Sequence, residues 1–238
     1  MKRPALVASL GLAVIVGAIF FDGELSLHGD NAEFIVLARS IAAGEGLTYT
    51  HLPEPVPSVK YPPVFPTMLA PLSDSVLSMK QLVLASYWAT VTLATAIGGF
   101  SSGVYTALNP HILLFSSQIM SELPFTALTL AAILTLPDSL ALGLAFAAAA
   151  YFTRSAGLVL LIAIVTHSHG RRRWVALVVT GACVAGWSLR NHLVADGGGF
   201  YFVQLLQANP YYPEMGWTTP AALTARIGHG LLLYWPAI

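Results

Sequence analysis

Long apolar runs, divided by short polar segments, are the feature that most constrains how this chain can fold. Hydrophobic residues make up 56% of the 238, and 9% are charged, against roughly 25% in soluble domains. Because the runs are continuous rather than alternating, they predict helices that cross a lipid bilayer and not the strands of a membrane barrel. The expected fold class is an all-α integral membrane bundle. Its spans are expected at about residues 4–21, 81–100, 103–120, 123–137, 139–153, 155–168 and 174–189, with a partial eighth run from about 221 to the C-terminus.

Charge and cysteine content exclude several classes of function. The formal net charge is zero and the sequence pI is about 7.1, so no excess of basic residues points to nucleic acid. Cys183 is the single cysteine, and it can neither form an internal disulfide nor build a zinc site alone. The first run follows a charged start, as a signal peptide does. However, it is longer than a usual signal core and no small-x-small cleavage site precedes Asp22, so we expect a retained first span.

Two basic clusters set the expected topology. Lys2-Arg3 and Arg171–Arg173 flank spans, and the positive-inside rule puts both in the cytoplasm, which requires an even number of crossings between them. Six crossings result if the run Ser139–Thr166 is a helical hairpin that turns near Arg154. The chain is expected to be a single module, 1–238. Its N-terminus is cytoplasmic, a cytoplasmic basic loop covers about 169–173, and a long first outer loop covers about 22–80.

The expected outer loop carries a pattern of its own. Apolar residues recur at helical spacing after Asp30 and Asn31, which are both good N-cap residues, and the pattern ends near Gly44 or Gly46. This predicts an amphipathic helix at the membrane surface. Six prolines in 51–66 then predict an extended, stiff segment. Five cations fall on the outer side in this topology, and an anionic ligand there would explain them: Arg39, Lys60, Lys80, Arg154 and Arg190.

Five motifs together resemble a known family of membrane enzymes. In chain order they are "GDNAEFIVLARSIAAGEG", "KYPPVFPTMLAPL", "FSSQIMSELPF", "YFTRSAGLVLL" and "WSLRNHLV". This series resembles the C-type (GT-C) membrane glycosyltransferases, and most of all the branch of protein mannosyltransferase-like and aminoarabinose lipid A transferases. The resemblance implies a multi-spanning enzyme that moves a sugar from a polyprenyl phosphate to an acceptor on the outer face of a bacterial-type inner membrane. Members are usually longer, so the chain corresponds to the shared N-terminal module.

Asp30 has two interpretations. As a residue type in this place it is a helix N-cap, whereas the resemblance implies the catalytic carboxylate. The chemistry suits one acid, because a phosphate leaving group needs no protonation and a single carboxylate can take the acceptor's proton. Direct attack then inverts the anomeric carbon. Glu33 is either a first-turn helix charge or a second acid that supports Asp30 or a metal.

The remaining candidates also have a structural alternative. Lys60 is a headgroup lysine or, by the resemblance, the ligand of the donor phosphate. Glu122 either lies at the start of a helix that Ser121 caps, or faces the active cavity. Arg154 and Arg190 are interfacial anchors or phosphate ligands.

His28 is a neighbour of the predicted site. With Asp30 it forms a His-x-Asp pair that could contribute two ligands to a divalent cation, although two ligands do not make a site. The sequence therefore leaves metal dependence open.

Two other functions stay open on the sequence. The chain could be an inactive or accessory protein of the same fold, or a transporter or flippase for a lipid-linked anion. A transporter is expected to carry charges near the bilayer midplane, whereas here they gather at the outer ends of the spans. The identity of the sugar and of the glycan, lipid or protein acceptor is open too.

Overall fold

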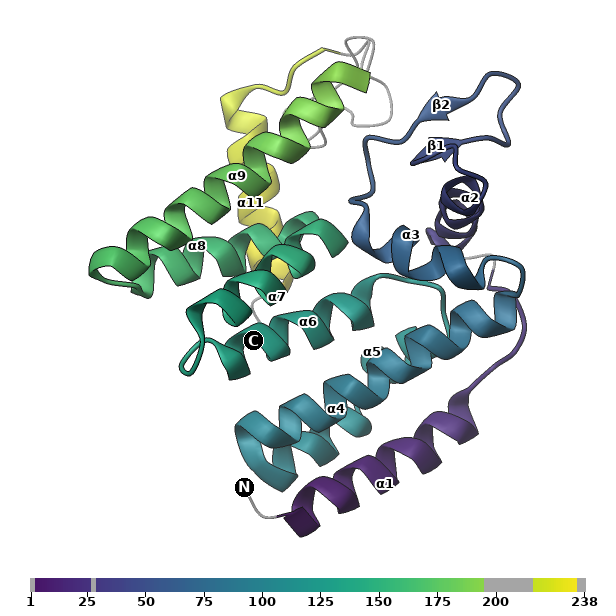
Figure 1. Ribbon diagram of the computed structural model, residues 1–238, viewed down its shortest axis with the longest axis vertical. Helices are drawn as coiled ribbons and strands as arrows, with labels where there is room; N and C mark the ends of the chain where they lie inside the picture. Colours follow the sequence, from purple (N-terminus) through teal and green to yellow (C-terminus); the bar gives the residue numbers. More distant parts are fainter. Residues whose placement is uncertain (1–2, 27–28, 195–215, 235–238) are drawn as a thin grey trace. The chain divides into compact units, whose positions relative to one another are not determined.

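The computed structural model describes residues 3–26, 29–194 and 216–234 (Figure 1). The described chain is mostly helical, as predicted, and its sheet is a two-stranded hairpin. It divides into two compact units, Met1–Trp187 and Ser188–Ile238. The prediction of a single module stays a prediction. The α-helices of the described residues are α1 Arg3–Phe20, α2 Asn31–Ala42, α3 Val64–Leu69, α4 Val76–Ala107, α5 Pro110–Ser116, α6 Glu122–Thr135, α7 Leu140–Thr153, α8 Leu158–His167, α9 Gly170–Val194 and α11 Pro220–Tyr234.

Two of the described helices, α1 and α4, are long and apolar enough to cross a membrane by length and composition. They pack antiparallel in Figure 1. The Lys80 ammonium, at the start of α4, donates to the carbonyl of Glu24, just beyond the end of α1. Most expected spans coincide with a helix, including α6, α7, α8 and α11. That any helix lies in a bilayer remains a proposal.

The expected span at 103–120 is wrong as a single helix. Gly99 has φ 80 and ψ −172, a conformation that essentially only glycine adopts, and it breaks α4. Beyond it, the Tyr87 hydroxyl donates to the Ala107 carbonyl at 2.9 Å, although a straight helix would separate these residues by about 30 Å. The chain therefore turns back at Gly99. The returning stretch is interrupted again where the side chain of Asn109 caps α5.

The predicted hairpin near Arg154 is confirmed. Arg154 has an extended backbone, with φ −147 and ψ 136, and it ends α7. A short 3-10 turn, Ser155–Gly157, follows and leads into α8. A Cβ atom on Gly157 would lie 2.5 Å from the backbone nitrogen of Tyr151, so glycine is needed where the chain folds back. The basic segment Arg171–Arg173 differs from expectation, because it forms the first turn of α9 rather than a loop.

The segment between α1 and α4 contains two helices, α2 and α3, and a β-hairpin between them. Helix α2 begins at Asn31 and ends at Ala42, close to the predicted bounds. Strands β1 Thr48–Tyr49 and β2 Val56–Pro57 pair antiparallel, which was not predicted. The expectation that 51–66 is extended throughout is wrong, because α3 begins at Val64. Pro66 fits there because the first-turn N–H groups of a helix have no partner within the helix.

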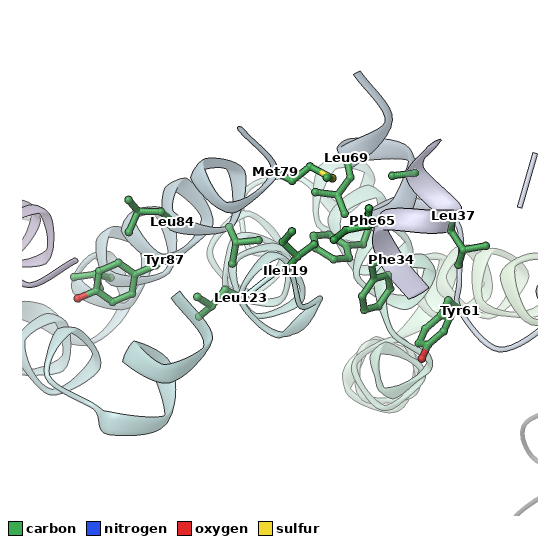
Figure 2. Close-up of a cluster of buried hydrophobic side chains, with 14 of the residues drawn as sticks. Phe34, Leu37, Tyr61, Phe65, Leu69, Met79, Leu84, Tyr87, Ile119 and Leu123 are labelled. Atoms are coloured by element: carbon green, nitrogen blue, oxygen red, sulfur yellow. The ribbon is translucent and has the colours of Figure 1, made fainter. Parts of the chain in front are cut away.

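Two buried clusters hold the first unit together. The first joins α1, α2, α3 and α4 to the loop before α6, and Figure 2 shows the side chains of Phe34, Phe65 and Ile119 within it. The ring centroids of Phe34 and Phe65 lie 4.8 Å apart, edge to face. The second cluster joins α6, α7, α8 and α9 and contains Cys183, which is buried. The apolar side of α2 thus packs against the rest of the unit.

The described part of the second unit contains the end of α9 and helix α11. The Thr219 hydroxyl accepts from the backbone N–H of Ala222, and Pro220 occupies the first helical position, where no N–H is required.

Candidate functional site

Asp30 lies at the N-cap position of α2, as predicted, but its side chain does not cap the helix. The preceding Gly29 has φ 66, which favours glycine and turns the chain into α2. The Asp30 carbonyl accepts from the backbone N–H of Phe34 at 3.1 Å. Its carboxylate lies instead 3.4 Å from the ammonium of Lys60. The backbone of Asp30 therefore starts the helix while its side chain belongs to another cluster.

Lys60 joins two carboxylates. Its Nζ atom lies 3.4 Å from Asp30 Oδ1 and 3.3 Å from Glu33 Oε2. The three side chains are each 40 to 44% exposed, so the cluster is open to a ligand. The β1–β2 hairpin and the Tyr61 ring position the lysine. That ring packs 4.6 Å from the ring of Phe34 on α2, and the ammonium lies 4.5 Å above its centroid.

The two carboxylates change the ionisation of their neighbours. Burial lowers the pKa of Lys60, but the charges of Glu33 and Asp30 and their hydrogen bonds outweigh it, so the pKa is raised above its ordinary value of 10.5. The pKa of Tyr61 is raised by burial and by the same two carboxylates. Its hydroxyl is buried and makes no hydrogen bond of standard geometry among the described residues, although both carboxylates lie close enough to affect it. Lys60 is therefore a cation and Tyr61 a neutral phenol at any physiological pH.

Glu122 and Arg154 form a second ion pair. Arg154 Nη1 lies 2.5 Å from Glu122 Oε1 and donates to the Ser121 hydroxyl at 3.1 Å. The pair joins the start of α6 to the end of α7, so the antiparallel packing of these helices brings it together. Ser121 was a predicted capping residue, yet its hydroxyl makes no cap bond and accepts from Arg154 instead. Glu122 Oε2 is buried with no hydrogen-bond partner among the described residues.

The two ion pairs lie on segments that touch. The side-chain oxygen of Asn31 accepts from the backbone N–H of Ile119 at 2.6 Å, across 88 residues of chain. A Cβ atom on Gly29 would lie 3.3 Å from the side chain of Met120. Asp30 stands between Gly29 and Asn31, and Glu122 follows Met120 by two residues. The structure therefore brings both acid–base pairs to the same end of the first unit.

The described part of the chain does not place two predicted site residues, His28 and Arg190, in either ion-pair cluster. His28 lies outside the described residues. Arg190 belongs to the second unit, where its Nη1 atom donates to the side-chain oxygen of Asn191 at 3.0 Å, and its role in phosphate binding stays a prediction.

Sequence reasoning missed the aromatic and amide side chains of the site. Tyr61 borders the cluster, and its place directly after Lys60 was the available signal. Ser58, two residues before Lys60, donates its hydroxyl hydrogen to the Tyr49 oxygen at 3.2 Å and so links Tyr49 to the segment that carries the lysine. Asn31 was read only as a possible cap, because nothing in the sequence relates it to Ile119.

The described residues contain no group of three or more His, Cys, Asp or Glu side chains arranged to hold a metal ion. The carboxylates of Asp30 and Glu33 both contact the ammonium of Lys60. A role for a divalent cation stays a prediction.

Comparison with protein-family models, curated proteins and solved structures gave no match. The geometry above and the motif resemblance are therefore the basis of the functional proposal.

Proposed function

We propose that this chain is an integral membrane glycosyltransferase of the C-type kind. It moves a sugar from a polyprenyl phosphate to an acceptor on the outer face of a bacterial-type inner membrane. The observation that carries the proposal is the cluster of Asp30, Glu33 and Lys60, half exposed and built on a segment that touches the Glu122–Arg154 region.

Asp30 is the proposed general base. Its carboxylate takes the proton of an acceptor hydroxyl as that oxygen attacks the anomeric carbon of the donor. The bond from this carbon to the phosphate oxygen breaks, and polyprenyl phosphate leaves as an anion with the electron pair. Attack opposite the leaving group inverts the anomeric centre. One carboxylate suffices, because the phosphate carries its charge without a proton.

Lys60 and Arg154 are the proposed ligands of the phosphate. An ammonium has three N–H donors and Lys60 points two of them at Asp30 and Glu33, so a third can reach a phosphate oxygen. Arg154 can offer a guanidinium edge to the same group. Both cations would stabilise the charge that develops on the leaving oxygen. Glu122 orients Arg154 and forms part of the cavity wall, and the polyprenyl chain lies between helices, in the bilayer.

Substitution of Asp30 tests the proposal. The purified full chain, in lipid vesicles, is given radiolabelled polyprenyl-phosphate sugars and a membrane extract as the source of acceptor. We expect label to move to the acceptor with the wild type and to fall at least about 100-fold with Asp30→Asn, the usual scale for loss of a general base. The matched control is Asp74→Asn, which changes an exposed acid of the same loop and should retain full transfer.

Full transfer by Asp30→Asn would refute the base assignment. Donor binding without turnover by the wild type would favour an accessory protein, and vesicle-to-vesicle movement of intact donor would favour a transporter.

A further inference from the structure

A cavity lies at the other end of the helices that carry Glu122 and Arg154. Helix α6 runs away from Glu122 and α7 returns to Arg154, so the turn between them lies at the far end, where α8 also ends and α9 begins. The cavity between these turns has a volume of about 840 Å³, within the usual range for small-molecule sites. It is outside the cluster of Asp30, Glu33 and Lys60.

The cavity is apolar inside and basic at its edge. Its wall is formed by aliphatic side chains of α6, of the turn after it, and of α7 and α8, and its edge by His167, His169 and Arg172. The His167 ring is fixed there, because Nδ1 hydrogen-bonds the Ala163 carbonyl at 2.9 Å. The aliphatic wall consists of Ile133, Leu136, Leu140, Leu160, Ala163 and Ile164.

The charges at this edge lack a counterion within the described chain. Arg171, Arg172 and Arg173 are exposed and follow one another in the first turn of α9, and no salt bridge to them is found among the described residues. Three cations in a row repel one another, and the start of a helix is its positive end, where anions are favoured and cations are not. Among the described residues, the acid nearest in sequence is Asp138, next to the lining residue Pro137. One carboxylate cannot neutralise three guanidinium groups.

We infer that this cavity binds an anionic phospholipid. The phosphate of the headgroup contacts Arg172 and the imidazoles at the edge, and an acyl chain fills the aliphatic wall. Charge complementarity selects an anionic over a zwitterionic headgroup, and the apolar wall selects a lipid over a free phosphate. This site does not depend on sugar transfer, and it is tested by binding alone.

Native mass spectrometry of the full chain in a nonionic detergent tests the inference, with phosphatidylglycerol and phosphatidylcholine as separate probes. We expect one phosphatidylglycerol to bind about 10-fold more tightly than phosphatidylcholine, the scale of one charge-assisted hydrogen bond. Millimolar inorganic phosphate should not displace it. Equal binding of the two lipids, or displacement by inorganic phosphate, would contradict the proposal.

Two arginines of the same helical turn provide a matched pair. Arg172 lines the cavity and Arg171 does not, so Arg172→Gln should lose about 10-fold in phosphatidylglycerol binding and Arg171→Gln less than about 3-fold. Equal losses would mean a diffuse charge effect and would overturn the site. Ala163→Trp, which fills the cavity, should weaken both lipids, and circular dichroism checks that each variant is folded. Undiminished lipid binding by folded Ala163→Trp would also contradict the proposed lipid site.

Discussion

At the residue scale, the backbone of Asp30 begins helix α2, whereas its carboxylate contacts Lys60. The sequence predicted a helix start at this residue, because acid and amide residues precede an apolar repeat. It could not predict that the carboxylate turns to Lys60, since the pair is 30 residues apart in the chain and depends on the β1–β2 hairpin. The same limit applies to Glu122 and Arg154, whose pairing follows from the antiparallel packing of α6 and α7.

Replacing Lys60 tests the electrostatics of the cluster. The raised pKa of Lys60 means that its contribution to stability is present below pH 10.5 and is lost as the pH rises through the higher folded-state value. The side chain is 44% exposed, so the contribution is at most about 1 kcal/mol. We expect the melting temperature of Lys60→Met to lie up to about 4 °C below that of the wild type at pH 7 to 9. The gap should close as the pH is raised through the folded-state pKa of Lys60. A gap that stays constant throughout this rise would contradict the ion pair.

Replacing Asn31 tests the contact between the two halves of the site. Asn31→Ala leaves the buried amide N–H of Ile119 without its acceptor, which costs about 1–3 kcal/mol. Asn109→Ala is the control, because it removes a more exposed cap of α5 and should cost about 1 kcal/mol. Denaturant unfolding gives both values, and hydrogen exchange at Ile119 should quicken only in Asn31→Ala. Unchanged exchange there would show that the contact is not formed.

At the scale of elements, prediction succeeded where one helix lies between clear end signals. The α2 pattern is such a case. The break at Arg154 was predicted differently, from the even number of crossings required between the two basic clusters. Prediction failed at 103–120, because hydropathy does not report backbone direction. The signals were Gly98-Gly99 and Asn109-Pro110, both inside apolar sequence. The β1–β2 hairpin was missed because its strands are two residues each and contain a proline.

Gly99→Ala tests the turn that breaks α4. No atom lies within 4 Å of the added methyl group, so the cost comes from φ 80 alone and is about 1–3 kcal/mol. Gly11→Ala in α1 also adds a methyl group in open space, but in a helical backbone, and should stabilise by about 0.5–1 kcal/mol. Opposite signs in denaturant unfolding are the expected result. Equal effects would mean that 99 can continue the helix.

At the scale of the whole molecule, the proposal fixes which ends of the helices face which side of a membrane. The chain has one cysteine, Cys183, so Cys183→Ala provides a background for labelling. Glu54→Cys, in the loop before β2, should react with a membrane-impermeant maleimide in intact spheroplasts. His169→Cys, between α8 and α9, should react only after permeabilisation. Labelling of both from the same side would refute the proposed topology.

The turn at Gly99 also bears on the order in which the first unit folds. The hydrogen bond from the Tyr87 hydroxyl to the Ala107 carbonyl closes a loop of 20 residues, whereas the bond from the Ile119 N–H to the Asn31 side chain closes one of 88. Closing a longer loop costs more entropy, and contacts distant in the chain form more slowly. The hairpin of α4 should therefore close early, without help from the rest of the chain. The contact between Asn31 and Ile119 should form among the last. The side chains of the candidate site should therefore come together only after the helices that carry them have packed.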